Sequence, residues 1–155
     1  MHPSPFRRRA CLRAAAALLF AFPAAAAETA TEPLTISTRQ GAFQFRVEIA
    51  DEEAERQQGL MFRRTLASDH GMLFVFGETR EIAMWMKDTP LSLDMVFVRA
   101  DGTVASIAER TQPFSEAIVA SGEPVAFVLE LRAGVSRLIG LKPGDRLEHR
   151  AFGRN

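Results

Sequence analysis

The run Leu93-Asp94-Met95-Val96-Phe97-Val98 carries an apolar side chain at five of its six positions. Alternate residues of a strand point to opposite faces of a sheet, so a run that is apolar on both faces predicts a strand buried on both sides. The run Val125-Ala126-Phe127-Val128-Leu129-Glu130-Leu131 has the same character. One carboxylate interrupts each run, and these two side chains, Asp94 and Glu130, are the first candidates for a functional role.

Further strand signals surround these two runs. Residues 43–49 alternate apolar and polar side chains, which predicts a strand with one wet face, and residues 34–38 are its expected hairpin partner across Gln40-Gly41. Other short apolar runs occupy residues 72–76, 82–86 and 103–108, and the turn Lys142-Pro143-Gly144-Asp145 leads into a last expected strand near 146–149. Seven or eight short strands with few helices predict a mainly β fold, as an antiparallel sandwich or a barrel-like single domain.

One or two short helices complete the predicted fold. Asp51 is placed to cap a helix over residues 52–58, and Gly59 is placed to end it. Residues 134–140 have room for another turn or two of helix. The chain has no repeat and no linker after residue 33, so the sequence predicts a polar tether at 28–33 and one β-rich domain at 34–150.

The first 27 residues are expected to be a secretory signal peptide. They combine a basic start, a short apolar core and a run of small residues that ends at Ala27. The uncharged stretch 14–27 is shorter than the ~20 residues of a spanning helix, so no stable membrane span is expected after cleavage. The sequence therefore predicts an exported protein, periplasmic or secreted.

Composition limits the possible partners. The 155 residues include 19 basic and 19 acidic side chains; four of the basic residues and none of the acidic ones lie in residues 1–27, so the remaining chain has a net charge of −4. That balance argues against nucleic acid as a partner. The one cysteine, Cys11, lies in the expected signal peptide, so no disulfide is expected, and no feature predicts an oligomeric state.

Several motifs resemble those of one known family. Its opening motif is similar to Arg56-Gln57-Gln58-Gly59-Leu60-Met61-Phe62-Arg63 followed by Gly71-Met72-Leu73-Phe74. Its most specific motif is similar to Met84-Trp85-Met86-Lys87-Asp88-Thr89 with Pro90 and Leu93-Asp94. Its closing motifs are similar to Val128-Leu129-Glu130-Leu131 with Gly134, and to Gly144-Asp145. From about Leu34 to His149 the chain thus resembles the domain-of-unknown-function 192 family.

The resemblance implies a compact, mostly β domain that is often exported, and it implies no particular activity. Two positions depart from the family pattern. The family usually carries Asn at the position of Asp88, and its proline usually stands directly before the Leu-Asp pair, whereas Leu91-Ser92 separate Pro90 from that pair here. The second departure puts the geometry of this loop in question.

Asp94 and Glu130 are the candidate catalytic residues. A carboxylate in an apolar strand either pairs with a cation or has a raised pKa, and a raised pKa suits acid–base chemistry. One hypothesis places both carboxylates in a cleft that faces Arg56, Arg63 or Lys87, as the acid and base of a hydrolase or transferase. The alternative is that they are buried counter-ions that fix loops to the sheet.

Trp85 and Lys87 are the first candidates for ligand binding. They alternate with Met84 and Met86, so one face of the expected strand carries an aromatic ring and a cation, and Asp88 adds an acceptor. An aromatic platform beside convergent polar groups often holds small polar ligands such as sugars. The main hypothesis is therefore an exported domain that binds a small polar molecule; the alternative is that Trp85 belongs to the core. The further predicted anchors are Arg56, Arg63, Asp94 and Glu130.

A copper site is the remaining hypothesis. Thioethers with an imidazole suit Cu(I), and Met84, Met86 and His70 could supply them, although methionine is also an ordinary core filler. The sequence has no H-x-x-x-H or C-x-x-C spacing, which argues against a zinc or iron enzyme. It also has no glycine-rich phosphate loop, so no cofactor is expected.

Overall fold

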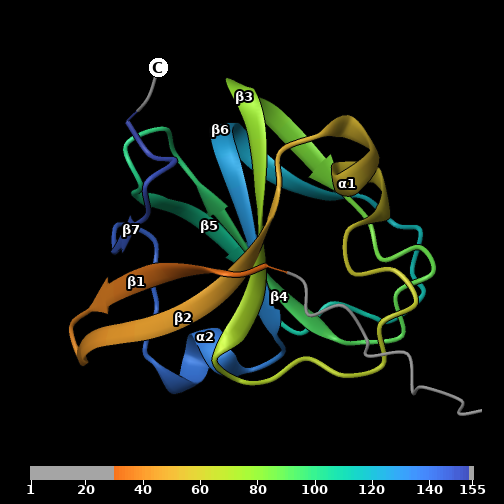
Figure 1. Cartoon of the computed structure of the whole chain (residues 1–155), viewed down its shortest axis with the longest axis horizontal. Coiled ribbons are helices and arrows are strands. Elements are labelled where there is room, and N and C mark those ends of the chain that lie inside the picture. Colours follow the sequence, from red (N-terminus) through yellow and green to blue (C-terminus); the bar gives the residue numbers. More distant parts are fainter. Residues whose placement is uncertain (1–29, 154–155) are drawn as a thin grey trace, which may run out of the picture.

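The structure is a computed structural model that describes residues 30–153, and in this range seven strands form one strongly curled sheet (Figure 1). The strands are β1 (Glu32–Thr38), β2 (Gly41–Ala50), β3 (His70–Met84), β4 (Leu93–Val98), β5 (Val104–Ala108), β6 (Val119–Arg132) and β7 (Arg146–Glu148). The two helices are α1 (Glu53–Gln58) and α2 (Val135–Leu138). The predicted mainly β single domain with one or two short helices is confirmed.

The sheet is barrel-like rather than a sandwich of two sheets. Its strands lie in the order β5-β4-β6-β3-β2-β1-β7, and the edges approach each other where Thr103 bridges to Arg146. The Leu147 N–H also donates to the Gly102 carbonyl at 2.8 Å. All neighbouring strands are antiparallel except β2 and β3, which are parallel because α1 and the loop after it carry the chain back across the sheet.

The central strands β4 and β6 are buried on both faces, as their apolar runs predict. One face packs into a core cluster that contains Val96 and Leu129 together with Val135 and Ile139 at α2. The other face packs into a second cluster that contains Met95 and residues near α1 such as Leu60. Each strand thus presents alternate side chains to two different environments, which is what positions the site.

The hairpin of β1 and β2 is as predicted, with Thr38 paired to Gly41 across the turn. β1 begins at Glu32, so Glu32 and Pro33 belong to the sheet and not to the predicted tether. The predicted helix forms and ends at Gly59, but its cap is Glu52 rather than Asp51, through a capping box with Glu55.

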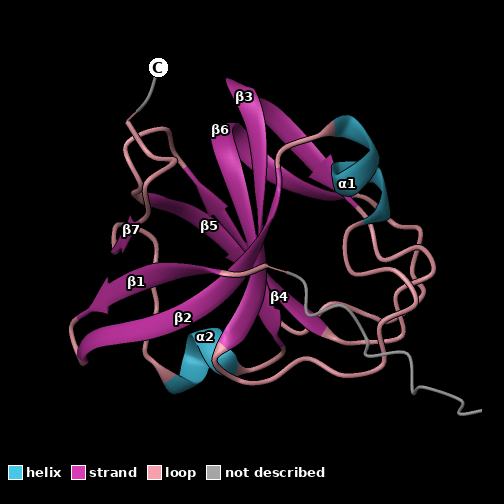
Figure 2. Ribbon diagram, viewed as in Figure 1, coloured by secondary structure: helices cyan, strands magenta, loops and turns pink. Residues whose placement is uncertain are grey.

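The runs 72–76 and 82–86 were each expected to form a strand, but they are parts of one long strand, β3, whose register against β6 shifts after Val75. β3 ends at Met84, so Trp85 and Met86 lie in the loop that follows (Figure 2). The predicted signal peptide, residues 1–27, lies outside the described residues. Within residues 30–153, neither helix has the length and apolar character that crossing a membrane requires.

Candidate functional site

A cleft of about 740 Å³ lies beside α1, where three separate segments of the chain meet. α1 and the turn after it contribute residues 56–61, the end of β3 and the following loop contribute 83–85 and 87–89, and β6 contributes Glu130. Figure 1 shows α1 and the long loops gathered on this side of the sheet. Parts of the opening motif and of the most specific motif therefore meet, with Glu130, at one cleft.

Glu130 is the buried carboxyl of this cleft, with only 4% of the residue exposed. Its directly paired neighbours across the sheet are Met72 on β3 and Met95 on β4, so thioethers and not cations flank it. Among the described residues it has no ion pair and no hydrogen-bond partner. Burial alone raises the pKa of Glu130 from 4.5 to about 8. At neutral pH the group is mostly protonated and can donate a hydrogen bond into the cleft.

Trp85 lies at the surface of the cleft and not in the core, since 45% of it is exposed. Lys87 lies on the same side, with its Nζ 5.4 Å from the centroid of the Trp85 ring. Met86, between them, points inward and is buried, and its Sδ accepts a hydrogen bond from Thr111 Oγ1 at 3.1 Å. The expected alternation thus brings an aromatic face and a cation together at the cleft.

Two arginines border the cleft beside Phe76. The guanidinium of Arg56 lies 5.9 Å from the ring centroid, and its Nη1 donates to the Val75 carbonyl at 2.9 Å. Arg80 lies 5.5 Å from the same centroid and forms an ion pair with Glu78 at 2.9 Å. The structure therefore places the predicted residue Arg56 at the cleft and adds Arg80. Lys87, by contrast, has no ion pair among residues 30–153.

Asp88 shapes the loop at the edge of the cleft. Its φ of 52° lies in the left-handed region, which Asp and Asn adopt more readily than other side chains, so either residue suits this position. Its carbonyl oxygen accepts the Phe62 N–H at 2.8 Å. Thr89 is 5% exposed, and its hydroxyl donates to the Lys87 carbonyl at 3.0 Å. These bonds fix the position of the loop.

Asp94 does not face the cleft, so the prediction that it shares a site with Glu130 is wrong. Register places Asp94 opposite Leu131 and Met95 opposite Glu130, and therefore the two carboxylates point to opposite faces of the sheet. Asp94 is fully buried, and its carboxylate accepts three backbone N–H groups at 2.9 Å each. These donors belong to Arg110, Gly134 and Ser136. Asp94 thus fixes two segments to the sheet, as the alternative expected, but through backbone N–H groups and not as the counter-ion of a cation.

Arg63 is also absent from the lining of the cleft, contrary to prediction. Its two terminal nitrogens donate to the carboxylate of Glu48 at 2.6 and 2.5 Å. Glu48, Met72 and Glu130 form one cross-strand row, in which Glu48 lies two strands from Glu130, roughly 10 Å away. Arg63 thus forms its ion pair with Glu48 and not with Glu130.

The structure does not assemble the predicted copper ligands. His70 and Met84 stand at opposite ends of the 15-residue strand β3, roughly 45 Å apart along its path. Met86 is buried in the core, and His70 Nδ1 lies 2.9 Å from the carboxylate of its neighbour Asp69. Within the described part of the chain, no three or more His, Cys, Asp or Glu side chains group as a metal site would require.

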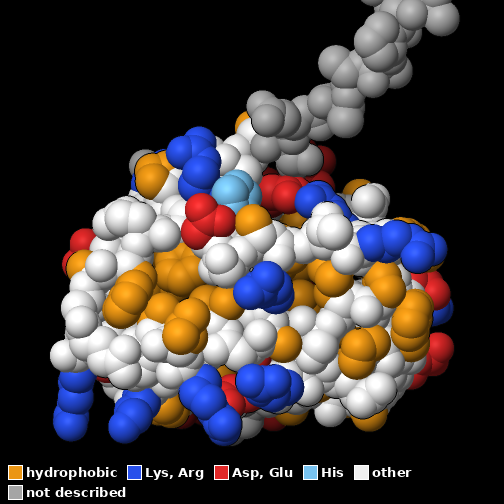
Figure 3. Space-filling model, turned by 90° about the horizontal axis from the view of Figure 1, so that it is seen from below, with side chains coloured by type: hydrophobic (Ala, Val, Ile, Leu, Met, Phe, Trp, Pro, Cys, Tyr) orange, Lys and Arg blue, Asp and Glu red, His pale blue; other side chains and the backbone are white. Residues whose placement is uncertain are grey.

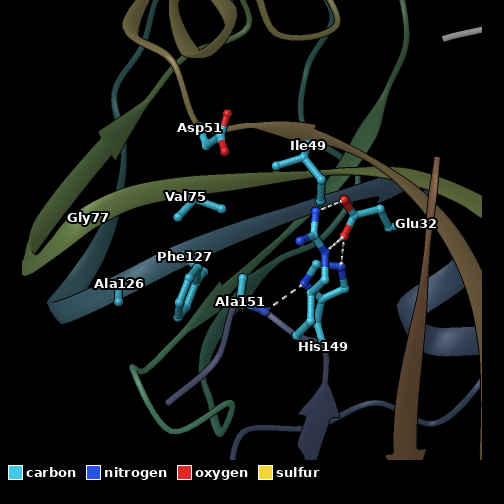
Figure 4. A pocket seen from close by; sticks show the side chains of 10 residues that line it. Glu32, Ile49, Asp51, Val75, Gly77, Ala126, Phe127, His149 and Ala151 are labelled. Atoms are coloured by element: carbon cyan, nitrogen blue, oxygen red, sulfur yellow. Dashed lines mark hydrogen bonds and ion pairs between the residues drawn. The ribbon is translucent and has the colours of Figure 1, made fainter. Parts of the chain in front are cut away.

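A second, smaller cavity of about 320 Å³ has apolar walls that include Val75 and Phe127 (Figure 4). Three of its charged or polar side chains, Glu32, His149 and Arg150, point toward one another, while Asp51 lies apart from them. Glu32 accepts hydrogen bonds from Arg150, and its Oε2 lies 3.1 Å from the buried His149 Nε2, without hydrogen-bond geometry. This cluster joins the start of β1 to the segment after β7. The cleft, whose buried carboxyl has no such partner, is the better candidate for a ligand site.

The sequence did not reveal every residue at the cleft. Phe76 and Arg80 lie on either side of the register shift in β3, and an alternation pattern gives no sign that two apolar runs continue as one irregular strand. Gly59 was expected only to end a helix. It also allows Phe74 to pack closely, because a Cβ at Gly59 would lie 3.0 Å from the Phe74 ring. The sequence signal that could have placed Gly59 at the site is its position within the family motif at residues 56–63.

Comparisons with known proteins agree with this description. The model of the DUF192 family, described as Uncharacterized ACR, matches residues 35–149. A proposed transcription regulator from Sinorhizobium meliloti 1021 is 51% identical, with a TM-score of 0.76, and the match covers 80% of this chain and 97% of that one. A protein of unknown function from Novosphingobium aromaticivorans DSM 12444 is 35% identical, with a TM-score of 0.75, over 77% of this chain and 85% of that one. No curated protein matches the chain. Since the family model covers most of its length, the chain belongs to the DUF192 family.

Proposed function

We propose that the protein binds a small polar molecule with one apolar face, and that a pyranose sugar bearing a carboxylate is the ligand class that fits the cleft best. The observation that carries this proposal is Glu130. Buried polar groups are nearly always hydrogen-bonded, and the Glu130 carboxyl has no partner among the described residues. Glu130 lines the cleft, so a molecule bound there can take the place of water as its hydrogen-bond partner.

The other side chains of the cleft match the remaining parts of such a ligand. The exposed ring of Trp85 offers a flat apolar surface to the C–H face of a pyranose. Lys87, which has no ion pair within residues 30–153, is available to a carboxylate. Asp88 and the protonated Glu130 supply an acceptor and a donor for hydroxyl groups.

Acid catalysis by Glu130 is a second candidate function, favoured by its pKa of about 8. Asp94 cannot be the second carboxylate of such a reaction, because it lies on the other face of the sheet. Glu53 and Asp88 are the other carboxylates that line the cleft. This candidate predicts that a bound sugar derivative is turned over, with a bell-shaped pH dependence that Glu130→Gln abolishes.

The proposal does not include nucleic acid. The relative from Sinorhizobium meliloti is described as a proposed transcription regulator. In the described part of this chain the two helices have six and four residues, too short for a recognition helix in a major groove, and residues 28–155 carry a net charge of −4.

We further propose that binding takes place outside the cytoplasm. The support is the sequence of residues 1–27, with its basic start, apolar core and small residues. N-terminal sequencing of the protein recovered from bacterial envelope and cytoplasmic fractions tests this location. The expected result is a chain that begins near Glu28 in the envelope fraction, whereas an intact Met1 in the cytoplasmic fraction would contradict it.

Thermal shift and calorimetry with the purified protein test the binding proposal. The probes are galacturonate and glucuronate, with glucose and inorganic phosphate to separate the sugar ring from the charge. A uronate at 100 times its Kd should stabilise the protein by about 2.7 kcal/mol, visible as a rise in Tm of several degrees.

The variants Trp85→Ala and Glu130→Leu should each abolish the rise in Tm. Leu138→Ala is the matched control, because Leu138 is an exposed apolar side chain of α2 that does not line the cleft. Undiminished uronate binding by both cleft variants would reject this site, and no stabilisation by any sugar would reject the ligand class.

A further inference from the structure

Several exposed apolar side chains belong to segments that adjoin the cleft. Among the described residues, five large hydrophobic residues are strongly exposed. One of them, Leu138, lies on α2, which contributes no residue to the cleft. The other four, with exposures of 45–72%, are Phe62, Trp85, Phe114 and Ile118. Met84 pairs with Val119 in antiparallel register, so the next residues, Trp85 and Ile118, lie opposite each other just beyond the end of the pairing.

Phe62 and Phe114, here called the aromatic rim, are tied by their backbones to the loop that edges the cleft. The Phe62 N–H donates to the Asp88 carbonyl at 2.8 Å, and the Phe114 N–H donates to the Thr89 carbonyl at 3.1 Å. Asp88 and Thr89 both line the cleft, but neither phenylalanine does. The aromatic rim therefore adjoins the cleft next to Asp88 and Thr89 without being part of its lining.

Both rim residues hold an unfavourable backbone conformation. Phe62 has a φ of 63° and Phe114 a φ of 60°, in the left-handed region where a bulky L side chain is strained and glycine is not. A turn alone would be served better by glycine. Strained residues of this kind cluster at functional sites, and the two residues here are 72% and 63% exposed.

Exposure by itself does not distinguish the rim. Figure 3 shows hydrophobic side chains between Lys and Arg side chains across the face of the molecule seen from below. Single exposed apolar residues are normal on a soluble surface. The combination of a left-handed backbone, a direct hydrogen bond to a cleft residue and an outward ring is what sets Phe62 and Phe114 apart.

We propose that the ligand is an oligosaccharide, one unit of which occupies the cleft while the following units stack on the aromatic rim. This inference rests on the proposed function and names its substrate class. A ligand confined to the cleft would not reach Phe62 or Phe114, and only a chain that leaves the cleft past Asp88 and Thr89 would do so. Successive sugar rings present apolar faces to aromatic side chains in the same way as the first.

Charge favours a glycan over an anionic lipid surface at this rim. The charges around the rim are of both signs: Asp88 is hydrogen-bonded to Phe62 through the backbone, Glu116 lies two residues after Phe114, and Arg63 and Arg64 follow Phe62. Residues 28–155 carry a net charge of −4. Anionic membranes attract clusters of Lys and Arg rather than such a mixed surface. A sugar chain has no comparable electrostatic requirement, because hydroxyl groups pair with either charge.

Calorimetry with a length series tests the inference. The probes are α-1,4-linked galacturonate and β-1,4-linked N-acetylglucosamine as monomer, trimer and hexamer, with the purified protein. We expect the trimer or hexamer of one series to bind at least tenfold more tightly than its monomer. The double variant Phe62→Ala/Phe114→Ala should reduce the affinity for the longer sugars to that for the monomer, whereas Leu138→Ala should leave the whole series unchanged.

The outcomes separate the two proposals. Monomer binding with no gain in affinity for longer sugars, or a gain that survives in the double variant, would overturn the oligosaccharide while leaving the cleft proposal intact. Failure of every sugar to bind would count against both. Binding to phosphatidylglycerol vesicles that the double variant loses, together with no length dependence, would overturn the glycan in favour of a membrane.

Discussion

Replacing Glu130 with Gln should stabilise the protein at neutral and alkaline pH. Gln has nearly the same shape as Glu and stays neutral at every pH. In the folded protein Glu130 lies between Met72 and Met95, and burial holds its pKa at about 8, well above the ordinary 4.5. Folding at neutral pH therefore requires this carboxyl to take up a proton, which is a cost that the Gln variant avoids.

The magnitude follows from the two pKa values. Below pH 4.5 the group is protonated in both the folded and the unfolded chain, so it does not affect stability. Between pH 4.5 and 8 only the unfolded chain loses the proton, and the stability of the native sequence falls as the pH rises. One pKa unit corresponds to about 1.4 kcal/mol, so the loss is about 3 kcal/mol at pH 7 and about 5 kcal/mol above pH 8.

Thermal unfolding followed by circular dichroism from pH 4.5 to 8.5 measures this effect. The Tm of Glu130→Gln should equal that of the native sequence near pH 4.5 and exceed it by roughly 10 °C at pH 7. The difference should grow further toward pH 8. Glu148→Gln is the control, since Glu148 is exposed on β7 and should show the same profile as the native sequence.

The shape of the difference matters more than its size. A Tm difference between Glu130→Gln and the native sequence that stays constant over the whole pH range would refute a raised pKa at Glu130. A lower Tm for Glu130→Gln at pH 8 would show that the carboxylate has a stabilising partner in the folded protein.

Three further predictions follow from other contacts. Asp94→Ala should destabilise the protein by about 3 kcal/mol in urea unfolding, since it leaves one buried and two partly buried N–H groups without their acceptor; an effect below about 1 kcal/mol would contradict that role. Acid should destabilise the protein through two groups: the hydrogen bond from Arg150 lowers the pKa of Glu32, and burial lowers the pKa of His149, so both favour the folded state at higher pH. In the Glu130→Gln background, which removes the opposing contribution of Glu130, stability should fall below pH 6.5 through the folded pKa of each group, and His149→Phe should flatten the upper part of the fall; an unchanged pH profile would argue against it. Phe62→Gly should be about 1 kcal/mol more stable than Phe62→Ala, because only glycine is relaxed at a φ of 63°, and equal stabilities would exclude backbone strain.

The fold was largely predictable because burial dominates its central strands. β4 and β6 carry apolar residues on both faces, and such runs have few other uses in a chain of this size. The parallel pairing of β2 with β3 was not predictable, since alternation fixes which face a side chain takes but not the neighbour of a strand. The cap at Glu52 was missed because Glu52 and Glu55 form a reciprocal box that competes with the simpler cap at Asp51.

The candidate site was predictable where its residues are close together in the sequence. Trp85, Lys87 and Asp88 are consecutive or alternate in one segment, so local geometry was enough to place them together. Asp94 and Glu130 look equivalent in sequence, and only the register of β4 against β6 shows that they point to opposite faces. The partner of Arg63 was also not predictable, because Glu48 lies 15 residues away in the sequence and only the fold brings the two side chains together.

The emission of Trp85 offers the most direct measurement on the cleft. Trp85 is the only tryptophan in the chain, which also has no tyrosine, so its fluorescence reports on this one side chain. Titration of the purified protein with galacturonate and its oligomers should give a saturable change in emission, which Glu130→Leu abolishes and Leu138→Ala preserves. A sugar that raises the Tm while the Trp85 emission stays unchanged would place binding elsewhere and contradict a ligand site at this cleft.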